Sequence, residues 1–102
     1  MTLNTVTTIP VENINHPGTT KRVDALMYEA MRAAMLKAMP ASENGLTLAE
    51  LGTRVVPHLP ESLYPGGDKS GWWLKTVQLD LEAKGVLVRT KSSPIRLHKA
   101  KR

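Results

Sequence analysis

The side chains in this sequence that could do chemistry are mainly cations, and half of them lie at the C-terminal end. Seven of the 14 lysines and arginines fall in residues 83–102, which contain none of the nine acidic residues. That segment therefore carries +7, and residues 1–82 carry 7 minus 9, or −2. Such a basic segment indicates a surface that faces a polyanion, with a merely solvated terminus as the plainer alternative.

The candidate nucleic-acid-binding residues extend from this segment back to position 69. A helix predicted over about 70–84 would offer Lys75, Thr76 and Gln78 to base edges. At its start, Lys69 and Ser70 could hold a phosphate near free backbone N–H groups, although a simple capped turn fits as well. The cations expected to follow the phosphate backbone are Arg89, Lys91, Arg96, Lys99, Lys101 and Arg102. The partner that these residues predict is double-stranded DNA.

Two apolar residues on the outward side of the same helix, Trp72 and Leu79, cannot read a hydrogen-bond pattern. We favour a position for Trp72 beneath the connection at 57–67, against Leu63 or Tyr64. Two other positions stay open: an exposed patch shared with Leu79, or a contact with a base or sugar. The patch would bind a protein partner or a second copy of the chain. This gives a second hypothesis, a protein–protein interaction or dimerisation module.

Two neighbours of these residues are predicted from the helical wheel. Trp73 falls in the core arc, and Asp80 falls toward the edge of the outward face, where it would repel phosphate.

Several classes of site are not supported. The chain has no cysteine, and His16, His58 and His98 lie too far apart for two imidazoles on one helix face. The run at 66–71 lacks the glycine spacing of a phosphate loop, and no serine lies in a GxSxG motif. We therefore expect no catalytic residues, metal or cofactor.

Local signals predict three helices and a hairpin. Asp24 caps a helix over 24–38, Thr47 and Glu50 form a capping box that starts the second helix, and Gly85 ends the third. Strands are predicted at 86–90 and 95–98, around a turn at 91–94. Alternation places Val88 and its apolar counterparts on the packed face, and Leu87 breaks that alternation.

Residues 1–20 are interpreted as an extended or flexible N-terminal arm, with a turn at Pro17–Gly18. One domain follows over 21–98, and 99–102 form a basic tail. The sequence contains neither a signal peptide nor an apolar run long enough to span a membrane, so we expect a cytoplasmic protein without membrane contact.

The capped second helix, the junction LEAKGVL and the basic hairpin resemble the winged helix-turn-helix superfamily over roughly residues 24–98. The segments NHPG, YEAMRAA, VPHLPESLYPGG and GWWLKTVQLDLEAKG are similar to a family of small bacterial winged-helix-like proteins without an assigned activity. The resemblance implies a mostly α fold with a small β-hairpin (α+β): three helices, a C-terminal two-stranded wing and an N-terminal arm. It also implies DNA binding through the third helix and the wing, in a regulatory or nucleoid-associated role.

Overall fold

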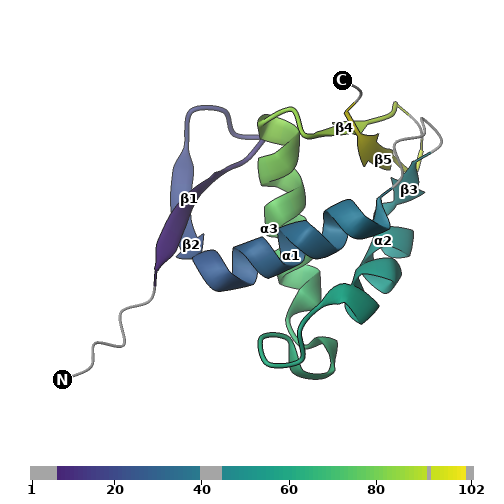
Figure 1. Cartoon of the computed structure of the whole chain (residues 1–102). Helices are drawn as coiled ribbons and strands as arrows, with labels where there is room; N and C mark the ends of the chain where they lie inside the picture. Colours follow the sequence, from purple (N-terminus) through teal and green to yellow (C-terminus); the bar gives the residue numbers. More distant parts are fainter. Residues whose placement is uncertain (1–6, 40–44, 92, 101–102) are drawn as a thin grey trace.

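The computed structural model describes residues 7–39, 45–91 and 93–100. Over these ranges the chain forms three α-helices and two small antiparallel sheets, which is an α+β architecture (Figure 1). The helices are α1 (Ala25–Ala38), α2 (Leu48–Val55) and α3 (Ser70–Ala83). The strands are β1 (Thr8–Glu12), β2 (Thr20–Asp24), β3 (Leu46–Thr47), β4 (Leu87–Arg89) and β5 (Arg96–Lys99).

The helix starts follow the predicted capping signals. The Asp24 carboxylate accepts hydrogen bonds from the backbone N–H groups of Leu26 and Met27 at the start of α1. At α2, the Thr47 hydroxyl accepts from the Glu50 N–H at 3.1 Å, and the Glu50 carboxylate accepts from the Thr47 N–H at 2.9 Å. Both predicted caps are confirmed. They were predictable from the sequence because each cap depends only on neighbouring residues.

Helix α3 lies at the centre of the molecule, and α1 crosses in front of it (Figure 1). Trp73, Leu74, Val77 and Leu81 are buried, as the helical wheel predicted. Gly85 adopts a φ of 76° just beyond the end of α3, so it provides the expected left-handed stop. One side of α3 is thus fixed in the core, and the opposite side is left for a surface.

The connection between α2 and α3 contains two short 3-10 turns, Val56–His58 and Pro65–Gly67. Tyr64 anchors it, because its buried ring carries a hydroxyl that donates to the Met27 carbonyl at 2.7 Å. The connection therefore packs toward α1.

The C-terminal sheet has the strand order β3–β5–β4, so β5 pairs on both sides. Strand β3, which the sequence did not predict, pairs Leu46 with Leu97. Gly45 immediately before it has a φ of 62°, and a Cβ there would lie 2.5 Å from the Leu97 carbonyl oxygen. This close approach explains the glycine.

The predicted packed face of the C-terminal hairpin is wrong for its first strand. Leu87 is 2% exposed and Val88 is 41% exposed, the reverse of the expectation, whereas Leu97 is buried as predicted. Val86 lies between α3 and β4: its N–H donates to the Leu81 carbonyl at 2.9 Å, and its half-buried side chain packs against the core, as predicted. Leu87, and not Val88, is therefore the buried residue of β4.

Strands β1 and β2 form a hairpin that the sequence analysis did not predict. Residues 8–12 of the expected arm pair with residues 20–24, and β2 leads directly into α1. The turn at Pro17–Gly18 is confirmed: Thr19 N–H donates to the His16 carbonyl, and Gly18 has a φ of 90°. Buried Val11 and Val23 hold one face of the hairpin on the domain. Residues 1–6 lie outside the described ranges.

None of the helices in the described ranges combines the length and the apolar character needed to cross a lipid bilayer.

Glycines 45 and 85 provide a matched test of the close approach. Both have positive φ, so alanine costs about 1–2 kcal/mol at either position. Only at Gly45 does the new Cβ also collide with backbone, which raises the expected loss for Gly45→Ala to about 2–5 kcal/mol. Urea unfolding of both variants checks this, and equal losses would contradict the account of Gly45.

Candidate nucleic-acid interface

The exposed side of α3 is a narrow surface, here called the α3 strip, made of Trp72, Lys75, Thr76 and Leu79. These residues recur at helical spacing, opposite the buried face. Trp72 and Lys75 are exposed, and Thr76 and Leu79 are partly covered. The strip therefore offers an aromatic ring, a cation, a hydroxyl and an apolar side chain.

Trp72 is 52% exposed, so the favoured position beneath the 57–67 connection is wrong. The Tyr64 hydroxyl of that connection instead donates to the Met27 carbonyl of α1. The adjacent Trp73 is buried as predicted, and the two rings meet edge to face with centroids 4.9 Å apart. Lys21 of β2 places its Nζ 4.9 Å from the centroid of the Trp72 ring, a cation–π contact.

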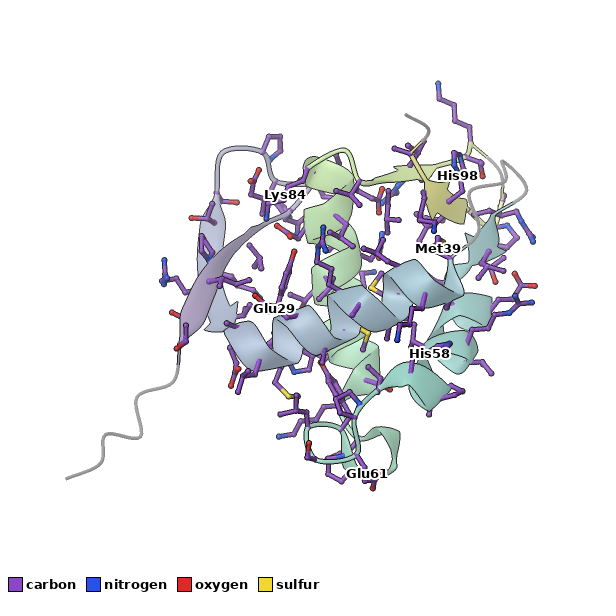
Figure 2. The ribbon with its side chains drawn as sticks, viewed as in Figure 1. Glu29, Met39, His58, Glu61, Lys84 and His98 are labelled. Carbon is purple, nitrogen blue, oxygen red and sulfur yellow. The ribbon has the colours of Figure 1, made fainter. Side chains whose placement is uncertain are left out.

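Asp80 does not lie at the edge of the exposed face, because its side chain is 0% exposed. Its carboxylate accepts hydrogen bonds from the Glu12 backbone N–H at 2.8 Å and from the Tyr28 hydroxyl. Lys84 Nζ forms an ion pair with it at 2.5 Å. Figure 2 shows Lys84 at the C-terminal end of α3, on the side where the β1–β2 hairpin lies. The prediction that Asp80 repels phosphate is therefore wrong.

The same arrangement affects Tyr28. Burial, followed by the hydrogen bond and the charge of Asp80, raises the pKa of the Tyr28 hydroxyl well above its usual value. The hydroxyl stays protonated and continues to donate to Asp80 at neutral pH.

Glu82, the other acidic residue of α3, is also buried. Its carboxylate accepts two hydrogen bonds from Arg89, one from Nε at 2.5 Å and one from Nη2 at 3.0 Å. The hydrogen bonds to Glu82 raise the pKa of the Arg89 guanidinium further above its usual range. Gln78 donates to the same carboxylate.

Gln78 is 1% exposed, so its predicted contact with base edges is wrong for this conformation. The helical wheel placed Gln78 near the edge of the outward face, but its buried amide donates to Glu82, which Arg89 of β4 also contacts. Its carbonyl oxygen is buried and has no hydrogen-bond partner within the described residues.

The cations of the C-terminal hairpin are less available than their number in the sequence suggests. Arg89 is paired with Glu82, and Arg96 lies 3.4 Å from the Glu50 carboxylate. Lys99 donates to the Leu36 carbonyl at 3.4 Å. Lys91 is exposed and, among the described residues, makes no hydrogen bond or ion pair. Lys101 and Arg102 lie outside the described residues.

At the start of α3, Lys69 is exposed and has a φ of 66°, which is unusual for a residue with a side chain. It makes no side-chain cap, and Ser70 begins the helix. Lys69 and Lys75 are three residues before and after Trp72. Asp68 is also exposed, so the loop end of the strip carries one charge of each sign.

A hollow of about 200 Å³ lies between the β1–β2 hairpin and the α3 strip. Its lining residues include Val11 and Lys21 from the hairpin and Thr76 and Leu79 from the strip. Sequence reasoning missed it because it requires the hairpin that was not predicted. The only early signal was the HPG turn.

Within the described residues, no group of three histidine, aspartate or glutamate side chains is placed to hold a metal ion. Figure 2 shows His58 beside the α2 end of the molecule and His98 on β5.

Fold and surface together define a small α+β domain whose central helix carries an exposed aromatic and basic strip. A family model matches residues 8–97, and the chain belongs to that family, described as a family of unknown function (DUF6958). The match begins with β1 and ends within β5, so it spans both hairpins. No curated protein and no solved structure matches the chain.

Proposed function

We propose that this protein is a winged-helix domain that binds double-stranded DNA with modest sequence preference, in a regulatory or nucleoid-associated role. The element order α1–β3–α2–α3–β4–β5 and the strand order β3–β5–β4 support this fold assignment. In such a domain α3 enters the major groove and the β4–β5 hairpin is the wing.

The observation that carries the proposal is the absence of exposed carboxylates from α3. Its two acidic residues, Asp80 and Glu82, are buried and ion-paired, whereas Lys75 is exposed on the strip. Lys21 adds a second positive charge beside Trp72. A helix face that carries a cation and no exposed carboxylate of its own attracts the phosphate backbone.

The proposed roles differ from the sequence-based assignment. Lys75 and Thr76 contact base edges, Lys69 and Ser70 contact phosphate, and Lys91 contacts the backbone from the wing. Arg89 and Arg96 instead form ion pairs with Glu82 and Glu50. Their proposed role is to position the wing and not to contact DNA. With two base-reading side chains in place of three, we expect weaker sequence preference.

Duplex binding should depend on salt and on Lys75. With Lys69 and Lys91 on phosphates, log affinity should fall against log salt with a slope of roughly −2. Lys75→Gln should cost about 1–3 kcal/mol of binding free energy and relax the sequence preference, because Lys75 contacts base edges. The control is Lys37→Gln, since Lys37 is exposed on α1, which packs on the buried face of α3.

Fluorescence anisotropy of a labelled mixed-sequence duplex over a salt series measures both the affinity and its dependence on salt. Absence of binding at about 50 mM salt would exclude the proposed function. Equal effects of Lys75→Gln and Lys37→Gln would remove the α3 strip from the interface.

A second candidate is a protein–protein interaction or dimerisation module that uses Trp72 and Leu79. The exposure of Trp72 favours it, because exposed tryptophans are frequent binding hot spots. Leu79 lies two turns along the same strip, so the two side chains would form one apolar contact.

Self-association tests the dimer form of this candidate. It predicts that sedimentation velocity detects a dimer of the wild type, and that Trp72→Ala or Leu79→Lys yields monomers. Leu26→Lys is the control, because Leu26 is an exposed leucine on α1. A wild type that stays monomeric at every concentration tested would exclude the dimer.

A further inference from the structure

Several residues with side-chain hydrogen-bond donors line the hollow beside the α3 strip, together with apolar Val11 and Leu79. Thr20, Lys21 and His16 come from the β1–β2 hairpin, and Thr76 comes from α3. Asn13 adds an amide whose oxygen is occupied, because it accepts from the Asn15 backbone N–H at 2.8 Å. The Asn13 NH2 group therefore remains as a donor, since no described residue accepts from it.

We propose that this hollow binds a phosphate group of the DNA backbone, so that the β1–β2 hairpin is a second DNA contact besides the wing. The inference rests on the proposed function. A phosphate needs several donors and a positive charge around it, and the residues that line the hollow include threonines, an asparagine and a lysine. The hollow also has space for part of the attached sugar, against apolar Val11 and Leu79.

The position of the hairpin agrees with this role. Figure 1 shows the β1–β2 hairpin and the β4–β5 strands on opposite sides of α3. A helix in the major groove has one phosphate backbone on each side of it. Elements on both sides of α3 can therefore each contact one backbone.

Lys21 is directed toward α3 by the strand register. It pairs with the buried Val11 and shares the inner face of the hairpin with Val23. Its ammonium lies over the Trp72 ring of the strip, and Lys21 also lines the hollow. Arg22 lies on the opposite face, where it donates to the hydroxyl and carbonyl of Thr8.

One lining residue opposes an anion. Glu12 is exposed at the edge of the hollow, while its backbone N–H is bound by Asp80. Replacing its side chain by glutamine removes a negative charge and keeps the backbone bond. The site therefore predicts changes of opposite sign at Lys21 and Glu12.

The test uses the full chain and one labelled duplex over a salt series. Lys21→Gln should weaken binding and reduce the magnitude of the salt slope by about 1. Arg22→Gln, the same charge change on the other face, should leave both close to wild type. Lys21→Arg should retain affinity, and Glu12→Gln should increase it.

Two results would overturn the proposal while leaving duplex binding intact: Lys21→Gln and Arg22→Gln with the same affinity, or Glu12→Gln without a gain. Thermal unfolding of each variant by circular dichroism confirms that the hairpin variants are folded. Retained affinity in Lys21→Arg separates loss of charge from loss of structure.

A separate experiment distinguishes failure of the phosphate site from failure of the proposed DNA-binding function. Inorganic phosphate is added to the 15N-labelled protein at constant ionic strength, with chloride as the reference anion. Shifts of Thr20, Lys21 and Thr76 amides in the wild type, absent in Lys21→Gln, support the phosphate site even if no duplex binds. Without those shifts and without duplex binding, both proposals fail.

Discussion

The buried carboxylate of Asp80 is the interaction on which the rest of this surface depends. It joins three parts of the chain: β1 through the Glu12 N–H, α1 through the Tyr28 hydroxyl, and the end of α3 through Lys84. A buried carboxylate is costly unless its oxygens are satisfied, and here these three donors satisfy them. The β1–β2 hairpin is consequently fixed beside α3, and a negative charge is withdrawn from the surface of that helix.

Glu82 has the corresponding role on the other side of α3. Its bidentate contact with Arg89 holds the β4 strand against the helix. The two acidic residues of α3 thus each anchor one neighbouring hairpin, and the strip between those hairpins keeps Lys75 and Trp72 without an exposed carboxylate. In the sequence, the negative charges of Asp80 and Glu82 count against DNA binding. In the folded chain the same two carboxylates are buried and support the surface that we propose binds DNA.

The features that were predictable from the sequence are local ones. The Asp24 cap, the Thr47–Glu50 capping box and the Gly85 stop each involve residues within one helical turn, so neighbouring letters suffice. The hairpin of β1 and β2 was missed, because pairing Val11 with Lys21 depends on packing against α3. Gln78 and Arg89 were assigned to DNA from a helical wheel and a charge count. Neither method can show that both side chains bind the buried carboxylate of Glu82. Trp72 was placed under a connection that Tyr64 in fact ties to α1.

The central claim is that the α3 strip faces DNA, and the two tryptophans provide its most direct measurement. Trp72 is exposed on the strip and Trp73 is buried beside it, so their indole N–H resonances in 15N-labelled protein report the two faces of one helix. Trp72→Phe assigns the pair. On addition of a duplex at low salt, the account predicts that the Trp72 resonance shifts or broadens strongly while that of Trp73 changes little. A duplex that is bound, by anisotropy, while the Trp72 resonance stays unchanged would contradict it.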